Sequence, residues 1–227
     1  MGYINFLLEA FKCGRCIGKG LSMTVLTLPI AIDVLDYLGT AAFAVTGALR
    51  AMSKRLDLMG AVVLAVVTAL GGGMMRDALI GHHPPAAFVD QSYLLIAITI
   101  GIVTFFWGRH IREQESWLIT LDAVGLGVFT LVGASIAHEA GLSAFGILFI
   151  AMLTATGGGV LRAMMVAEIP FILNKEIYAS ASLIGALSYL ALTYAEASSF
   201  WIALIVIMMT TSIRLIAWRC HIQLPRA

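Results

Sequence analysis

The sequence predicts an all-α integral membrane protein in which seven transmembrane helices form two three-helix repeats of inverted topology, followed by one further helix. Three observations predict this class. Hydrophobic residues make up 60% of the 227-residue chain and charged residues 12%, about half the charged fraction of a soluble domain. Seven apolar stretches are each long enough to cross a bilayer. The first half of the chain also matches the second half after a fixed shift.

Residues 1–32 form an N-terminal extension with three open interpretations. Three basic residues precede an apolar run, as at the start of a secretory signal: Lys12, Arg15, Lys19 and Leu21–Ile32. The apolar residues between Ile4 and Phe11 could instead form a short interfacial helix. Translation could also start at Met23.

Two cysteines in the extension, Cys13 and Cys16, have the spacing of a metal-ligand or redox pair. A zinc site needs two further ligands close by. The remaining candidates, Cys220 and His221, lie at the other end of the chain, on the opposite membrane side in the predicted topology. We therefore expect no metal site and no cofactor.

The predicted spans follow the extension in close succession. They are Val34–Ala51, Leu58–Ile80, Ser92–Trp107, Trp117–Ala137, Ser143–Val166, Ile177–Ala195 and Phe200–Ala217. Tryptophans fall at or near several of their ends, where interfacial aromatic residues are typical. Lys and Arg concentrate in the 1–2, 3–4 and 5–6 loops and at the C-terminus, which predicts a cytoplasmic C-terminus in a multi-pass protein of the cell inner (plasma) membrane.

The internal repeat appears when the chain is shifted by the interval between Asp36 and Asp122, which is 86 residues. Aspartate, arginine, proline and a triple glycine then coincide, which apolar composition alone does not produce. We expect a first repeat over residues 33–112, a second over 117–196 and a seventh helix over 198–219. Because each repeat holds three spans, the second copy enters the membrane from the opposite side.

Each repeat carries a glycine triplet inside an apolar span. The triplets are Gly71, Gly72 and Gly73 in the first repeat, and Gly157, Gly158 and Gly159 in the second. Three successive glycines disfavour a helix, since each costs about 1 kcal/mol relative to alanine. We favour broken helices whose freed carbonyls, with the hydroxyls of Thr68, Thr154 and Thr156, line a path for a cation. The alternative is that the glycines permit close helix packing.

An arginine follows each triplet, Arg76 in the first repeat and Arg162 in the second. A buried arginine is costly unless it is paired or hydrated. Asp77 comes directly after Arg76, whereas Ala163 occupies the matching position after Arg162. The arginines could clamp freed carbonyls, gate the path or contact an anion, or they could extend to the membrane interface.

Further polar candidates lie at the predicted span ends. We expect Asp36 and Asp122 to complement the dipoles of helices one and four, in preference to a cation-attracting vestibule. Lys175 and Glu176 fit a charge pair at the start of span six. Tyr178 and Ser180 follow them and could add polar lining.

Some function classes find no support in the sequence. We see no nucleophile–base constellation, metal cluster or nucleotide-binding loop, so we do not expect an enzyme. The formal net charge is +1 and no basic stripe is present, so we expect no nucleic-acid partner.

The glycine motifs, with the stretches Asp36–Ala48, Glu168–Pro170 and Lys175–Tyr178, resemble the prokaryotic trimeric intracellular cation (TRIC) channel family. The resemblance covers about Asp33–Trp218. It implies seven spans in a 3+3+1 inverted repeat, a homotrimer in the lipid membrane, and a pore in each protomer beside spans two and five that conducts monovalent cations, chiefly potassium. Ala163 departs from the family pattern, in which an acid often follows the second arginine.

Two hypotheses of transport remain, beside a third in which the protein is a membrane scaffold that conducts and transports nothing. The first is a passive channel for potassium or sodium ions, with one pore per protomer. The second is a secondary transporter of a small amino acid such as glycine, in which half-helix N–H groups and Arg76 or Arg162 would hold the carboxylate. Sequences of this kind have also been labelled as glycine transporters.

Overall fold

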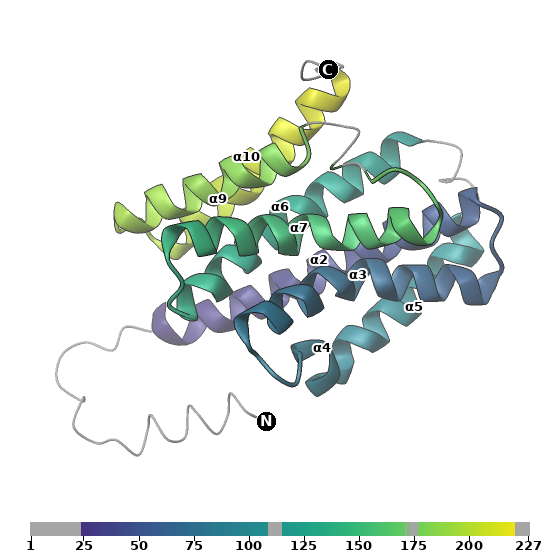
Figure 1. Cartoon of the computed structure of the whole chain (residues 1–227), viewed down its shortest axis with the longest axis horizontal. Coiled ribbons are helices and arrows are strands. Elements are labelled where there is room, and N and C mark those ends of the chain that lie inside the picture. The colour runs from purple at the N-terminus through teal and green to yellow at the C-terminus, as the bar shows by residue number, and fades with distance from the viewer. Residues whose placement is uncertain (1–23, 109–114, 171, 173–176, 221–227) are drawn as a thin grey trace. The chain divides into compact units, whose positions relative to one another are not determined.

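The computed structural model describes residues 24–108, 115–170, 172 and 177–220, with side chains from residue 32 onward. Contacts divide the chain into two compact units, Met1–Asp33 and Val34–Ala227. Apart from the first turns of one helix, the features discussed below lie in the second unit. Helices and turns make up its described residues, so the prediction of a helical chain is confirmed for them (Figure 1).

Each predicted span corresponds to a helix. The helices are α2 (Thr24–Ser53), α3 (Leu58–Ile80), α4 (Ala86–Val89), α5 (Gln91–Trp107), α6 (Glu115–Glu139), α7 (Ala144–Met165), α9 (Ala179–Tyr194) and α10 (Ser199–Arg219). Five of them, α2, α3, α6, α7 and α10, contain a stretch long and apolar enough to cross a membrane. Helices α5 and α9 are apolar but shorter. The short helix α4 lies in the connection between α3 and α5.

The two glycine-rich helices begin in the same way. Asp57 caps α3 by accepting a hydrogen bond from the Gly60 N–H at 2.8 Å. Ser143 caps α7 through the Gly146 N–H at 3.4 Å. Both caps satisfy one of the N–H groups that a helix start leaves without a partner. Equivalent positions in the two halves therefore start equivalent helices.

Helix α3 packs along α7, and these two helices connect the halves of the large unit (Figure 1). Helix α5 packs on α3, whereas α6 and α9 pack on α7. Helix α10 packs on α6 and α9. The seventh predicted span thus lies against the second half of the chain.

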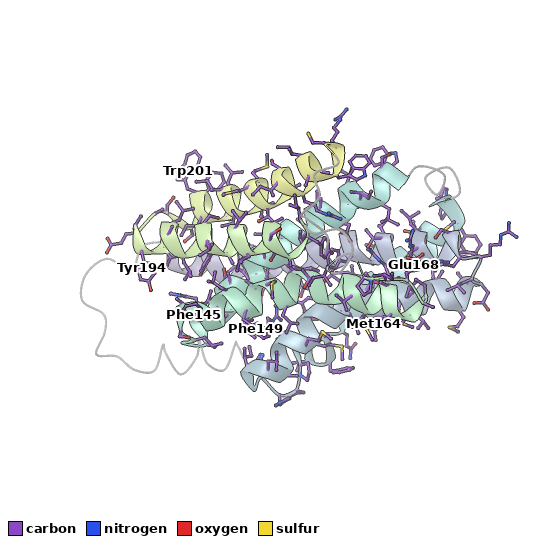
Figure 2. All side chains as sticks on the ribbon, turned by 45° about the horizontal axis from the view of Figure 1, so that its top comes forward. Phe145, Phe149, Met164, Glu168, Tyr194 and Trp201 are labelled. Atoms are coloured by element: carbon purple, nitrogen blue, oxygen red, sulfur yellow. The ribbon has the colours of Figure 1, made fainter. Side chains whose placement is uncertain are left out.

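Large apolar side chains cover the outside of these helices. Figure 2 shows Phe145, Phe149 and Met164 along α7, and Trp201 on α10. Their exposed fractions are 84%, 53%, 64% and 55%. An apolar exterior of this kind fits a protein whose surroundings are lipid or other apolar protein surface.

Candidate functional site

Helices α3 and α7 continue through both glycine triplets. The α-helix runs without interruption from Leu58 to Ile80 and from Ala144 to Met165. The predicted breaks are therefore wrong, and so is the path lined by freed carbonyls that depended on them. The physical reason is the contact between the two helices, which favours glycine strongly enough to offset its low helix propensity.

The contact between the triplets is reciprocal. A Cβ atom added at Gly72 would collide with the Thr154 carbonyl oxygen, and one added at Gly158 would collide with the Thr68 carbonyl oxygen. The two contacts exchange under the 86-residue shift, since Gly72 corresponds to Gly158 and Thr68 to Thr154. A Cβ at Gly73 would meet nothing closer than Arg76 Nη2 at 3.7 Å. Gly72 and Gly158 are thus the positions where the backbones approach most closely.

The three threonines predicted to line a path are buried within their own helices. Thr68 donates its hydroxyl to the Leu64 carbonyl at 2.6 Å. Thr154 and Thr156 do the same toward the carbonyls of Ile150 and Met152, at 2.7 and 2.8 Å. This bond to the carbonyl four residues earlier is common for threonine in helices. Their hydroxyls are therefore satisfied within the helix.

A first polar cluster lies around the end of α3. It comprises Asp36, Thr40, Arg76, Asp77 and Tyr93. Arg76 Nε lies 2.8 Å from Asp77 Oδ1, and both side chains are at most 3% exposed. The other Asp77 oxygen accepts the Ala86 N–H at 2.9 Å, which fixes the start of α4. Asp36 accepts the Tyr93 hydroxyl at 3.0 Å.

A small cavity that is open at its mouth is lined by the first polar cluster. Leu70, Met74 and Phe129 supply apolar parts of its wall. Arg76 Nη1 is buried and has no hydrogen-bond partner among the described residues. A buried guanidinium N–H without an acceptor is costly. The cavity therefore offers a donor to a water molecule or another small polar group.

A second polar cluster lies around the end of α7. It comprises Thr46, Asp122, Arg162, Tyr178 and Arg214. Arg162 Nη2 lies 3.0 Å from Asp122 Oδ1, and Arg162 Nη1 donates to the Thr46 hydroxyl at 2.7 Å. Arg214 from α10 places its guanidinium carbon 4.8 Å from the centre of the Tyr178 ring. All five residues are buried.

The two arginines that follow the triplets thus take different partners. Arg76 pairs with the next residue, whereas Arg162, which is followed by Ala163, pairs with Asp122 forty positions earlier. Both arginines are 3% exposed, so neither extends to the interface. The expectation that Asp36 and Asp122 sit in first helical turns is wrong. Helices α2 and α6 begin earlier, at Thr24 and Glu115, which places both acids inside the helices.

Two tyrosine–aspartate pairs connect α2 with the start of α5. Tyr37 donates to Asp90 while Tyr93 donates to Asp36, and the tyrosine rings lie 4.8 Å apart. Asp90 also accepts the Ser92 N–H at 2.9 Å. The Tyr37 hydroxyl, followed by this N–H, lowers the pKa of Asp90. These two hydrogen bonds fix α2 against the start of α5, beside the first polar cluster.

An ion-pair network connects the ends of α2 and α7. Arg50 Nε donates a hydrogen bond to the Glu168 carboxylate at 2.7 Å. Lys54 Nζ lies 2.8 Å from the other carboxylate oxygen. Figure 2 shows Glu168 beyond the C-terminal end of α7. Burial raises the pKa of Glu168, but the hydrogen bonds from Lys54 and Arg50 outweigh it, so the pKa lies below its ordinary value. The carboxylate is therefore ionised at neutral pH.

Sequence reasoning missed Arg214, Tyr93 and Thr46. Arg214 had a usable signal, because a charge within an apolar span is rare and marks function or a specific partner. Tyr93 and Thr46 had none, since tyrosine and threonine are common in such spans. Of the remaining predicted residues, Ser180 is half-buried. Lys175 and Glu176 lie outside the described residues, as do Cys13 and Cys16.

No group of three His, Cys, Asp or Glu side chains that could hold a metal ion occurs in the part of the chain that the structure describes. Two of the buried arginines pair with an aspartate, Arg76 with Asp77 and Arg162 with Asp122.

Comparison with known families gives two matches within this chain. The protein-family model described as "Glycine transporter" matches residues 33–109 and, a second time, residues 119–194. The UPF0126 inner membrane protein YadS of Escherichia coli (strain K12) is 38% identical over 193 residues, which cover 84% of this chain and 93% of that protein. A UPF0126 membrane protein of Deinococcus radiodurans is 38% identical over 166 residues, or 72% of this chain and 77% of that protein.

Solved structures give the same relationship. The TRIC trimeric intracellular cation channel orthologue from Rhodobacter sphaeroides superposes with a TM-score of 0.81 at 34% identity, over 85% of this chain and 99% of that one. A structure that describes conductance through TRIC cation channels has a TM-score of 0.78 at 33% identity, over 86% and 96% of the two chains. Together these matches show that the chain belongs to the prokaryotic TRIC channel family, to which the glycine-transporter model applies.

Proposed function

We propose that the chain crosses the membrane seven times as two inverted three-helix repeats, 33–112 and 117–196, followed by a seventh helix. The two separate matches of one family model support this proposal. So do the contacts that exchange under the 86-residue shift. In addition to the triplet contacts, Gly39 lies against Phe129 and Gly125 against Phe43. The rings of Phe43 and Phe129, which correspond to each other, meet at 5.0 Å, as expected near a pseudo-two-fold axis.

The function that this arrangement supports best is a passive channel for monovalent cations, chiefly potassium. The observation that carries it is a pair of buried polar clusters, one at the end of α3 and one at the end of α7. Charged groups inside the membrane are expensive and mark ion pathways. The path would run beside the α3–α7 contact and connect the clusters, within one protomer. The TRIC cation channels among the solved relatives support the same function.

The formal charges favour cations at one end of this path. Asp36, Arg76 and Asp77 sum to −1, and a negative charge between apolar walls raises the local concentration of cations. The cavity beside these residues is the part of the path where we expect a potassium or sodium ion to reside.

We further propose a homotrimer in the cell inner membrane, surrounded by lipid, with the C-terminus in the cytoplasm. The Rhodobacter sphaeroides relative, which is described as a trimeric channel, supports the assembly. The inner-membrane protein of Escherichia coli supports the location. The distribution of Lys and Arg between loops supports the orientation.

Purified protein in planar bilayers tests this function. We expect unitary currents that reverse near the potassium equilibrium potential in a gradient of potassium chloride. Gly72→Leu serves as the inactive control, because its side chain would enter the space of the Thr154 carbonyl. Reversal near the chloride potential, or no current in repeated preparations, would overturn the proposal.

A secondary transporter of glycine is the alternative, and two observations favour it. One is the description of the family model. The other is Arg76 Nη1, a buried donor without a partner among the described residues, in the same cavity as Asp36. A guanidinium and a carboxylate on one cavity wall match the two charges of an amino-acid zwitterion.

Counterflow of labelled glycine in proteoliposomes separates the two functions. A carrier predicts saturable exchange of glycine without unitary current. A channel predicts current without exchange. Both measurements use one reconstituted sample, so inactive protein cannot be mistaken for either result.

A further inference from the structure

The ion-pair network of Glu168 joins the two halves of the chain at the C-terminal ends of α2 and α7. Glu168 follows α7 in the second half, and its partners Arg50 and Lys54 belong to the first half. All three side chains are partly exposed, Lys54 most of all at 42%. Ion pairs that water reaches contribute little to stability. This contact between the halves can therefore break and form again without unfolding the protein.

The backbone turn that positions Glu168 recurs at other helix ends in the described part of the chain. One residue takes a left-handed conformation, and the N–H of the next residue bonds to the carbonyl five positions earlier, as in the Schellman motif. For Glu168 this carbonyl is that of Ala163, at 2.9 Å. The left-handed residues are Arg55, Gly81, Gly141, Ala167 and Glu196.

Four of these turns correspond in pairs under the 86-residue shift. Arg55 corresponds to Gly141, and Gly81 corresponds to Ala167. The turns of Arg55 and Ala167 lie beside Lys54 and Glu168, at the end of the α3–α7 pair that carries the ion pairs. The two glycine turns follow α3 and α6 and lie at the other end. The two ends thus share a backbone shape but differ in the residues that adopt it.

The left-handed conformation is costly for residues other than glycine, because their Cβ crowds the following carbonyl oxygen. At Gly81 and Gly141 an added Cβ would meet nothing within 4 Å, so the backbone conformation alone favours glycine there. Arg55 and Ala167 hold φ angles of 58° and 53° without that advantage. Strain of this kind persists only where surrounding contacts impose it. The ion pairs of the neighbouring Glu168 are such contacts.

The glycine end has no equivalent of the ion pairs at the corresponding positions. Glu168 corresponds to His82, and Arg50 and Lys54 correspond to Ile136 and Ala140. Neither isoleucine nor alanine carries a charge that could pair with a histidine. Strained turns and ion pairs therefore occur together at one end of the α3–α7 pair, and the corresponding positions at the other end have neither.

The network lies just beyond the second polar cluster. Arg162 of that cluster donates to Thr46 on α2, one helical turn before Arg50. Val166, between Arg162 and Glu168 in the chain, packs against a buried apolar group formed by Ala51, Ala61 and Leu64. Apolar constrictions oppose the entry of water and ions. The network thus fastens α2 to the turn after α7 beside an apolar contact, where the proposed path would leave the protein.

We propose that the Glu168 ion pairs are a latch that keeps this end of the cation path closed, and that the strained turns at Arg55 and Ala167 favour its release. The proposal rests on the channel function above. In the latched state the ion pairs hold α2 to the turn after α7, and both turns stay left-handed. In the released state the ion pairs are broken, both turns relax to negative φ, and the apolar contact at Val166 separates.

Single-channel recordings test the latch through the ratio of open time to closed time. Glu168→Gln should raise this ratio about threefold, the size of effect expected from a partly exposed ion pair. Arg50→Gln should raise it as well. The double variant should rise no further than Glu168→Gln alone, because both changes remove the same interaction. Glu196→Gln removes an acid from an exposed position in another turn and should stay near wild type.

Relief of strain should change the ratio in the opposite direction. Ala167→Gly makes the left-handed turn easy and so stabilises the latched state, which should lower the ratio of open to closed time at least about threefold. Arg55→Gly should lower it too. Glu196→Gly relieves the same strain in the turn after α9 and should leave the ratio near wild type. A purely structural role would not give opposite signs at the adjacent positions 167 and 168.

The outcomes separate this proposal from the channel function. If wild type conducts while Glu168→Gln leaves or lowers the ratio, or while Ala167→Gly leaves or raises it, the latch is wrong and the channel function stands. If wild type carries no current, the channel function fails first. Should Glu168→Gln not fold, Lys54→Gln removes only the more exposed partner and should raise the ratio by a smaller factor. An unchanged ratio in that folded variant would overturn the proposal.

Discussion

Arg162 and Asp122 form a buried ion pair, with Nη2 3.0 Å from Oδ1 and the two side chains 3% and 0% exposed. Arg76, the counterpart of Arg162, makes no such bond to Asp36, the counterpart of Asp122. It pairs instead with Asp77, the residue directly after it. The chemical difference is one residue, since Ala163 stands where the first half has Asp77. Asp36 lines the cavity and accepts the Tyr93 hydroxyl.

Loss of the Asp122 carboxylate should be rescued by a new acid at position 163. Asp122→Asn removes the buried ion pair with Arg162 and should lower the free energy of unfolding by about 2 to 4 kcal/mol. Adding Ala163→Asp should restore at least half of this loss, because Asp77 neutralises Arg76 from the equivalent position. Unfolding in mixed micelles measures the effect. Ala163→Asn is the uncharged control, and rescue by Asn as large as rescue by Asp would contradict this explanation.

Neighbouring glycines of the first triplet should differ sharply in their tolerance of alanine. Gly72→Ala and Gly158→Ala place a methyl group against a backbone carbonyl oxygen of the facing helix, so each should destabilise the protein by about 1 to 3 kcal/mol. Gly73→Ala meets only ordinary contacts and should be neutral or slightly stabilising. Thermal unfolding of the detergent-solubilised variants gives the comparison. Equal effects at positions 72 and 73 would contradict the close approach of α3 and α7.

Asp77→Asn should disturb the connection after α3 as well as the charge of Arg76. The change removes the ion pair with Arg76 and weakens the bond to the Ala86 N–H, at a cost of about 2 to 4 kcal/mol. Amide hydrogen exchange should also rise in residues 86–89. Asp57→Asn is the matched control, because asparagine caps a helix about as well as aspartate. Unchanged exchange in α4 would show that Asp77 does not hold this segment.

Stability should depend on pH through Glu168. Its folded-state pKa is lowered, so its contribution is fully present above the unfolded pKa of about 4.3. It is lost as pH falls through the folded pKa. Because the groups are partly exposed, the contribution should be about 1 kcal/mol or less.

The stability difference between wild type and Glu168→Gln should therefore be constant from about pH 7 to about pH 5, and should disappear at lower pH. Glu196→Gln, a change at an exposed position, is the control. A difference that grows as the pH falls would have the wrong sign for this network.

The helices could be predicted from the sequence because they depend on local properties. The limits expected for span two, Leu58–Ile80, are those of α3, since an N-cap at Asp57 and a left-handed glycine at Gly81 mark both ends. The early start of α6 was missed because polar residues such as Glu115 can extend a helix beyond the bilayer. A span that is predicted from the length of an apolar run does not include such polar residues.

The state of the glycine triplets could not be settled from local rules. Propensity favours a break at Gly71–Gly73, while close contact with another helix favours continuity, and the outcome depends on a partner 86 residues away. The same applies to Arg162, whose partners Thr46 and Asp122 are 116 and 40 residues distant. The unequal pairing of the two arginines was nevertheless foreseeable, because Ala163 cannot do what Asp77 does.

We propose that this chain is a cation channel whose path runs between two unequal polar clusters. The most direct test is the reversal potential of purified wild-type protein in a potassium chloride gradient, recorded with Gly72→Leu alongside. We expect reversal close to the potassium potential and no current from the variant. Reversal at the chloride potential, or glycine exchange without any current, would contradict it.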